Sequence, residues 1–198
     1  LFGQDRKVFS IATSEKDICW LRLTAVGTPG HGSRPHEDNS AVRLMRALLK
    51  LAEWDRGITF TAETRAYVER LHEAGLLPSL DDREALEARI RGTPELHAMF
   101  VNTLNVTMLS AGIKANVIPA RSEAVIDCRL LPGQSKADWI EQVRDYIADD
   151  RITIELISPD QVEPAAVPWD TELFRTIQDV LREAMEDAVV VPTMTIGG

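Results

Sequence analysis

Cysteine is scarce in this chain, which has only two, Cys19 and Cys128, among 198 residues. The two are far apart and neither belongs to a Cys-x-x-Cys pair, so they form neither a zinc knuckle nor a dithiol redox motif. Both lie in segments with the residue types of strands. We therefore expect two buried free thiols.

Long hydrophobic runs are also missing. No apolar run approaches the ~20 residues of a membrane-spanning helix, and the first residues show neither the basic nor the apolar region of a signal peptide. We expect a cytoplasmic protein without a membrane partner. The chain begins at Leu1 without methionine and stops at Gly197 and Gly198, directly after the largely apolar run 189–196, so we expect both ends to be cuts within a longer protein.

Positive charge is the third deficit. Lys and Arg number 22 against 31 Asp and Glu, for a net charge of −9, and the basic residues are scattered along the chain. This distribution lacks the basic footprint of a nucleic-acid-binding protein, so we expect no nucleic-acid partner. With 44% hydrophobic and 27% charged residues, the chain is typical of a globular protein with one sizeable core or two small ones.

Hydrophobic periodicity predicts an α+β domain over residues 16–158. The two strand candidates on either side of residue 116 are expected to pair as antiparallel neighbours, and Asn39 or Ser40 is expected to cap the first helix. In chain order the predicted elements are strand 18–26, helix 40–52, strand 104–109, strand 123–131, helix 135–147 and strand 152–156. This is the βαββαβ order of a ferredoxin-like sandwich, an antiparallel sheet with helices on one face.

Two segments fall outside this pattern. Residues 58–100 combine a helical patch with a charge-dense stretch, and we expect them to form a helical arm inserted in the domain. Residues 159–198 begin with a Pro-rich joint and continue with an amphipathic helix and the apolar run 189–196. Because a mostly apolar strand is usually covered on both faces in a parallel sheet, we expect this tail to be the start of a second, truncated α/β catalytic domain.

The candidate chemistry begins with His31, which stands between Gly30 and Gly32 in a loop that leaves the first predicted strand. Flanking glycines let the backbone approach another surface closely, and an imidazole held out from the sheet could donate a hydrogen bond to a developing oxyanion. A solvated loop histidine is the alternative. The nearby His36-Glu-Asp38 spacing lies at a helix entry, where Asp38 is a natural cap, and we reject it as a metal site.

Two further polar residues have both a functional and a structural explanation. Asn116 precedes Val-Ile-Pro119 in a loop, where asparagine is common because it tolerates turn geometry. Arg129 shares a strand face with Asp127. The two side chains could form a same-face ion pair, or the guanidinium could bind a substrate carboxylate. The residues alone leave these alternatives open.

Taken together and in this order, three motifs resemble those of the lid or dimerisation domain of the dinuclear-zinc peptidases. They are Gly30-His-Gly-Ser-Arg-Pro35, Asn116-Val-Ile-Pro119 and Asp127-Cys-Arg-Leu-Leu-Pro-Gly133. That family includes aminoacylase, succinyl-diaminopimelate desuccinylase, acetylornithine deacetylase and bacterial glutamate carboxypeptidase. The resemblance covers about residues 15–198, and the arm at 58–100 resembles only the longer carboxypeptidase-S-like and aminoacylase-like members.

The resemblance implies roles for individual residues. His31 matches the lid histidine that reaches into an active site, often that of the partner subunit, and helps polarise the scissile carbonyl. Asn116 matches an asparagine of the same substrate-facing surface, and Arg129 matches the arginine that binds the substrate's carboxylate. Gly197 and Gly198 match a glycine pair that borders the substrate pocket.

The family's zinc-ligand motifs are not found in this sequence, whose four histidines have no carboxylates placed to complete a zinc set. The resemblance implies a full-length metallopeptidase or amidohydrolase in which two zinc ions activate a water that cleaves an amide bond in small peptides or N-acyl amino acids. We expect this fragment to bind no metal, to be inactive alone and to form a homodimer. The alternatives are a stand-alone ferredoxin-like domain that binds a small carboxylated ligand, and a purely structural dimerisation module.

Overall fold

The computed structural model describes residues 7–158 and 166–197. Contacts divide the chain into two compact units. The first unit comprises the described residues of Leu1–Asp17, Gly57–Val101 and Glu163–Gly198, and the second those of Ile18–Arg56 and Asn102–Val162. None of the helices in the described part is long and apolar enough to cross a membrane.

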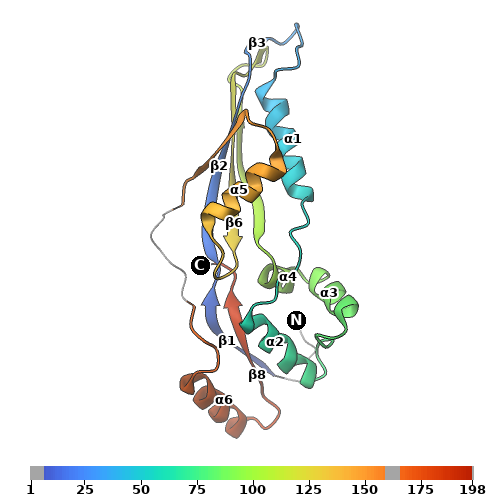
Figure 1. The fold of residues 1–198 in the computed structure, drawn as a ribbon, viewed down its shortest axis with the longest axis vertical. Coiled ribbons are helices and arrows are strands. Elements are labelled where there is room, and N and C mark those ends of the chain that lie inside the picture. Colours follow the sequence, from blue (N-terminus) through green and yellow to red (C-terminus); the bar gives the residue numbers. More distant parts are fainter. Residues whose placement is uncertain (1–6, 159–165, 198) are drawn as a thin grey trace. The chain divides into compact units, whose positions relative to one another are not determined.

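The second unit is built on a four-stranded sheet with the strand order β4-β6-β2-β7 (Figure 1). β4 pairs antiparallel with β6, with Thr103 opposite Arg129 and Ala111 opposite Ser122. β2 pairs antiparallel with β7. The predicted antiparallel pairing is therefore confirmed. The four strands are β2 (Asp17–Val26), β4 (Thr103–Ala111), β6 (Arg121–Leu130) and β7 (Ile152–Leu156).

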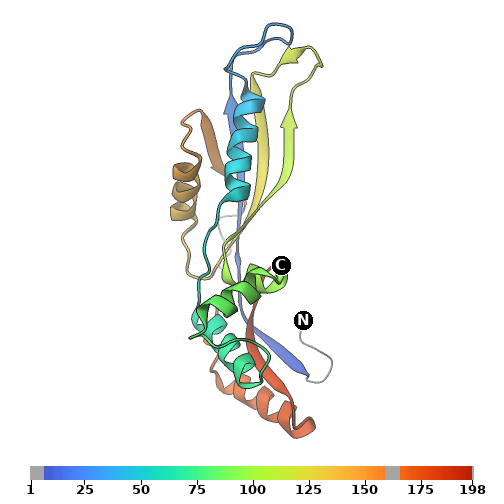
Figure 2. The same ribbon diagram turned by 90° about the vertical axis from the view of Figure 1, so that its right-hand side faces the viewer.

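Both helices of this unit lie on one face of the sheet (Figures 1 and 2). α1 (Ser40–Glu53) packs against β4 and β6, and α5 (Lys136–Ile147) packs against α1. Every second residue of β6 is buried in the core that these helices share with the sheet, because successive side chains of a strand point to opposite faces. The residues between them, which include Asp127 and Arg129, belong to the other face of the sheet.

The core of the second unit contains both cysteines as buried free thiols, which confirms the expectation from the sequence. Next to this core, Trp54 stacks on Trp139 of α5 with ring centroids 5.2 Å apart, and on Tyr146 at 4.5 Å. Such aromatic pairs contribute about 0.5–1.5 kcal/mol each beyond the burial of their area. The stack thus ties the end of α1 to α5.

Hydrogen bonds explain where α1 begins. The Asn39 side chain accepts from the amides of Ala41 and Val42, at 2.9 and 3.3 Å, so Asn39 is the N-cap. A side-chain cap of this kind contributes about 1 kcal/mol. Ser40, the other candidate, is buried and donates through Oγ to the carbonyl oxygen of Pro119 at 2.8 Å. Its hydroxyl also lies 2.9 Å from that of Ser122, so Ser40 ties the helix start to β6.

The first unit contains a two-stranded parallel sheet of β1 (Val8–Glu15) and β8 (Val189–Thr195). β8 therefore belongs to a parallel sheet, as expected for the tail. β1 is a strand that the sequence analysis did not predict. Pro192 stands within β8, opposite Ile11, and an edge position tolerates its missing amide.

Residues 58–100 are helical, as predicted, and form α2 (Ala62–Glu73), α3 (Arg83–Arg91) and α4 (Pro94–Phe100). Their apolar side chains share one core with Val191 of β8. The contacts group these helices with β1 and β8 in the first unit. α6 (Glu172–Ala184) belongs to the same unit, and Phe174 is its buried residue.

Candidate functional site

Two short strands bring the first two sequence motifs together. β3 (Gly30–His31) pairs antiparallel with β5 (Val117–Ile118), so that His31 lies opposite Val117. The next amide, that of Gly32, donates to the carbonyl oxygen of Asn116 at 2.8 Å. The structure thus places His31 and Asn116, which are far apart in the sequence, on one two-stranded platform beyond the ends of β2 and β6 (Figure 1).

Main-chain contacts fix the start of the loop that carries His31. The amide of Gly27 donates to the carbonyl oxygen of Ala120 at 2.9 Å. A Cβ at this glycine would lie 2.7 Å from both the carbonyl oxygen of Asp38 and the amide nitrogen of Ser40, which is closer than van der Waals contact allows. Glycine is therefore required here because the two ends of the loop touch.

Asp38 holds these loop ends together. Its carboxylate accepts from the amide of Thr28 at 3.0 Å and from the Thr28 hydroxyl at 2.7 Å. On its other oxygen it accepts from Arg43 at 2.7 Å and from Arg151 at 3.1 Å. Hydrogen bonds to the charged form, first from Arg43 and then from Thr28, lower the pKa of Asp38 from 3.8 to about 2. Asp38 is thus an anionic anchor at ordinary pH.

The His31 ring is held on one side only. Its Nδ1 lies 3.2 Å from the amide nitrogen of Ser33 and 2.8 Å from the Ser33 hydroxyl. Its Nε2 makes no hydrogen bond with any residue that the structure describes, and His31 is exposed. One ring nitrogen is therefore engaged with the turn while the other is available to a ligand.

Arg129 makes the ion pair that the sequence left open as one alternative. Its Nε donates to Asp127 Oδ1 at 2.7 Å, and a terminal nitrogen donates to Oδ2 at 3.2 Å. This fork geometry is the strong form of the Arg–carboxylate pair. The remaining terminal nitrogen, NH1, is buried without a partner among the described residues. The guanidinium therefore retains donor capacity on the helix-free face of the sheet.

Arg129 does not lie with His31 and Asn116 in the same chain. It stands eight residues beyond Arg121 along β6, which is about 27 Å at about 3.4 Å per residue. The platform with His31 and Asn116 adjoins the Arg121 end of that strand, since Gly27 bonds to Ala120. The three predicted residues of the second unit thus form two separate groups.

The remaining predicted positions are less informative. Gly197 is exposed, and a Cβ there would meet nothing within 4 Å. Gly198 lies outside the described residues. Within residues 7–158 and 166–197, no three His, Cys, Asp or Glu side chains are grouped in a way that could hold a metal ion. The described residues therefore do not fit a zinc site.

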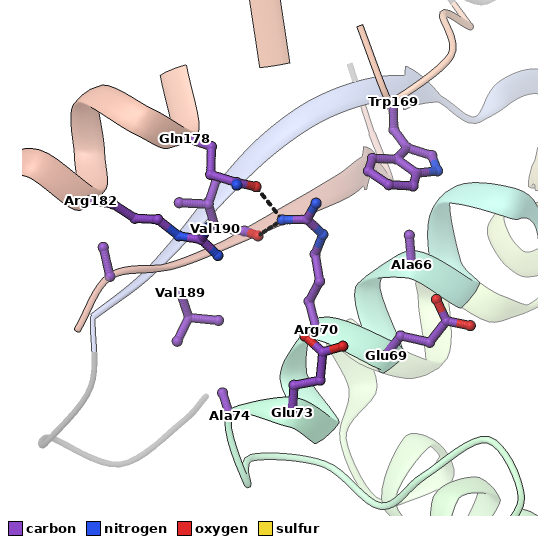
Figure 3. A pocket seen from close by; sticks show the side chains of 11 residues that line it. Ala66, Glu69, Arg70, Glu73, Ala74, Trp169, Gln178, Arg182, Val189 and Val190 are labelled. Carbon is purple, nitrogen blue, oxygen red and sulfur yellow. Dashed lines mark hydrogen bonds between the residues drawn. The ribbon is translucent and has the colours of Figure 1, made fainter. Parts of the chain in front are cut away.

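Sequence reasoning missed two features. One is the role of Ser33 and Asp38 in holding the His31 loop: the sequence predicts Asp38 as a helix cap, but Asn39 takes that position. A pocket of about 490 Å³ in the first unit was also unforeseen, lined by residues of α2, α6 and β8 (Figure 3). Within it, Arg70 donates to the side chain of Gln178 and to the carbonyl oxygen of Val190, and its guanidinium lies 5.1 Å from the Trp169 ring. These contacts occupy Arg70 within the fold.

Comparison with known proteins shows to which family the chain belongs. The family model for the M20 peptidase dimerisation domain matches residues 13–153. The chain belongs to the M20 peptidase dimerisation-domain family. A probable carboxypeptidase S-like protein 2 of Dictyostelium discoideum is 32% identical over 202 residues, which cover 98% of this chain and 38% of that protein. Human aminoacylase-1 is 26% identical over 179 residues, which cover 87% of this chain and 37% of the enzyme.

Solved structures show the same fold for this M20 chain. The dipeptidase Dug1p from Saccharomyces cerevisiae matches with a TM-score of 0.61 at 15% identity, over 100% of this chain and 46% of that one. The chain thus spans less than half the length of these relatives. The resemblance to aminoacylase-like and carboxypeptidase-like proteins inferred from three short motifs is confirmed.

Proposed function

We propose that this M20 chain is the lid and dimerisation part of a zinc-dependent hydrolase that cleaves an amide bond in small peptides or N-acyl amino acids. The names of the relatives, a carboxypeptidase-like protein and an aminoacylase, support this substrate class. The observation that carries the proposal is the β3–β5 pairing, which joins His31 and Asn116 in one platform. The strand order of the second unit supports the ferredoxin-like sandwich as its architecture.

The metal belongs to parts of the full-length protein outside this chain. Two zinc ions would there activate the attacking water, and the described residues contribute no ligand set. We therefore propose that residues 16–158, as the lid, and 159–198, as the start of the catalytic domain, are inactive without the remainder. Loss of turnover on chelation of the full-length protein, with recovery on adding zinc, tests the metal dependence.

The residues of this chain act on the substrate side. His31 donates from its free Nε2 to the oxyanion that develops on the scissile carbonyl, a role that depends on a donor being in place before the reaction. Asn116 contacts the substrate from the same platform. Arg129 binds the substrate's carboxylate through its guanidinium, which the bidentate pair with Asp127 orients. Gly197 and Gly198 border the substrate pocket.

The two groups of residues serve different active sites of a homodimer. The separation of about 27 Å along β6 is too large for His31 and Arg129 to contact one small substrate from the same chain. We propose that Arg129 serves the site of its own subunit, whereas His31 and Asn116 reach the site of the partner. A dimer is then needed for each complete site.

The edge strand β4 supplies a surface for this dimer. β4 is the outer strand of the sheet, so one of its sides has no neighbouring strand within residues 7–158 and 166–197. Such an edge can pair with another chain. Met108 and Leu109 are 66% and 60% exposed on this strand, and Met45 and Leu49 are exposed on the neighbouring α1. We propose that a second copy of the chain covers these side chains.

Mixed dimers of the full-length protein test the division of roles. A His31→Ala subunit paired with an Arg129→Ala subunit keeps one site with both residues intact, so we expect about half the wild-type activity per heterodimer under two-fold symmetry. The matched control pairs His31→Ala with Asn116→Ala. These two residues share one platform, so neither site of that heterodimer is complete and no rescue is expected.

Other outcomes point to the alternatives. If the first heterodimer shows no rescue, His31 and Arg129 do not serve separate sites. If the His31→Ala homodimer keeps full turnover, the chain is a purely structural dimerisation module. If the isolated chain binds a small carboxylate through Arg129 and the full-length protein has no metal-dependent activity, it is a ligand-binding domain.

A further inference from the structure

The hydrogen bonds of the His31 ring define which nitrogen carries its proton. The amide of Ser33 donates to Nδ1 at 3.2 Å. A main-chain N–H can only donate, so Nδ1 must accept with its lone pair. The Ser33 hydroxyl, at 2.8 Å from the same nitrogen, then also donates to it. In the neutral ring, the proton is therefore on Nε2.

The backbone around the ring leaves little freedom to change this arrangement. The carbonyl oxygen of His31 accepts from the amide of Arg34 at 2.8 Å, which closes a turn over Gly32 and Ser33. On the other side, His31 pairs with Val117 and Gly32 bonds to Asn116. Ser33 is therefore placed under Nδ1 by the same turn that ends the β3–β5 platform.

We propose that Ser33 is a positioning residue that keeps His31 in its Nε2–H tautomer and aims this donor away from the turn. The inference rests on the proposed oxyanion role of His31 and deepens it. An oxyanion needs a donor, and the opposite tautomer would present a lone pair to it. The Ser33 hydroxyl and amide thus decide whether the free ring nitrogen attracts or repels the developing charge.

A second histidine supplies an internal contrast. His72, at the end of α2, has its Nδ1 3.1 Å from the carbonyl oxygen of Leu77. A carbonyl can only accept, so the neutral His72 ring carries its proton on Nδ1. One chain thus holds two imidazoles whose surroundings impose opposite tautomers, which makes them a matched pair for measurement.

Nitrogen NMR of the chain labelled with ¹⁵N-histidine tests the tautomer directly, at a pH where the imidazoles are neutral. The His31 signals, assigned by their loss in the His31→Gln variant, should show a bare Nδ1 and a protonated Nε2. His72 should show the reverse pattern. In Ser33→Ala, the Nδ1–H form of His31 should gain population, and Ser33→Thr should restore the wild-type spectrum. A protonated Nδ1 on His31 in the wild type would overturn the proposal.

Kinetics of the full-length protein separate this inference from the proposed function. Ser33→Ala should lower kcat by up to about tenfold with little change in KM, as expected for the loss of one neutral hydrogen bond that acts in the transition state, and Ser33→Thr should recover it. His31→Gln, whose amide nitrogen replaces Nε2, should retain more activity than His31→Asn. If His31→Ala abolishes turnover but Ser33→Ala leaves kcat unchanged, the positioning role fails while the proposed function stands. If His31→Ala leaves turnover unchanged, the oxyanion role itself fails, whatever the tautomer.

Discussion

The amide of Gly32 donates a hydrogen bond of 2.8 Å to the carbonyl oxygen of Asn116. This bond extends the β3–β5 pairing by one residue and brings together two loops separated by more than 80 positions in the chain. Because the contact is between main-chain groups, it positions His31 through the backbone.

Replacing Gly27 by alanine should destabilise the His31 loop. The new Cβ would lie 2.7 Å from two main-chain atoms, Asp38 O and Ser40 N, and forced overpacking of this kind costs about 1–3 kcal/mol. Faster hydrogen exchange over residues 27–40 should report the change. Gly32→Ala is the matched control, since its Cβ would meet Asn116 O at an ordinary 3.4 Å. Equal exchange in the two variants would contradict the prediction.

Acid should loosen the second unit through Asp38. The pKa of this group in the folded chain is about 2, below its ordinary 3.8, because Arg43 and Thr28 hydrogen-bond to the carboxylate. A depressed pKa contributes stability that is fully present above the ordinary value and is lost as the pH falls from about 4 to about 2. Arg121 lowers the pKa of Glu123 in the same way, so Glu123 adds to the same slope.

The measurement is the midpoint of urea unfolding of the second unit at each pH in this range. Near-ultraviolet circular dichroism of the Trp54–Trp139 stack monitors the unfolding. The Asp38→Asn variant has no carboxyl to protonate at this position, so its midpoint should fall less steeply than that of the wild type. Parallel pH profiles for the two proteins would show that Asp38 is not an anchor.

Leu109→Lys should dissociate the proposed homodimer. Leu109 is 60% exposed on the edge strand β4, and a charge placed in a buried interface without a partner is strongly unfavourable. Sedimentation equilibrium should give the mass of one chain for this variant and of two chains for the wild type. Thr153→Lys is the control, because Thr153 is exposed on β7, the opposite edge strand of the sheet, and should not affect the dimer. A dimeric Leu109→Lys protein would exclude β4 as the interface.

Cys128 should be inert towards thiol reagents until the second unit unfolds. Burial raises the pKa of this thiol from 9.0 to about 12, which lowers the thiolate fraction at neutral pH roughly 1,000-fold. Its reaction with a disulfide reagent should follow the unfolding transition in urea. An Ala137→Cys variant, with its thiol at an exposed position of α5, should react at once in the folded protein. Equally rapid labelling of Cys128 without urea would contradict the expectation.

Much of the second unit could be predicted because its signals are local. The alternation of buried and outward-facing residues in β6 and the helical spacing of apolar residues in α1 and α5 involve residues only a few positions apart. Each of these elements forms at the residues that show its pattern. β1 was not predicted, and its partner in the sheet, β8, lies about 180 residues away. The grouping of residues 57–101 likewise depends on Val191, which completes their core from the far end of the chain.

For the candidate site, too, some features follow from the sequence and others only from the tertiary structure. By itself, the sequence determined which functional groups are present: an imidazole between two glycines, an asparagine in a turn, and an arginine on the same strand face as an aspartate. Only the tertiary structure decided that His31 adjoins Asn116, that Arg129 stands at the other end of β6, and that Ser33 lies against Nδ1. The physical reason is that side-chain identity and local periodicity are properties of neighbouring residues, whereas strand pairing and the contacts it creates depend on register across the whole chain.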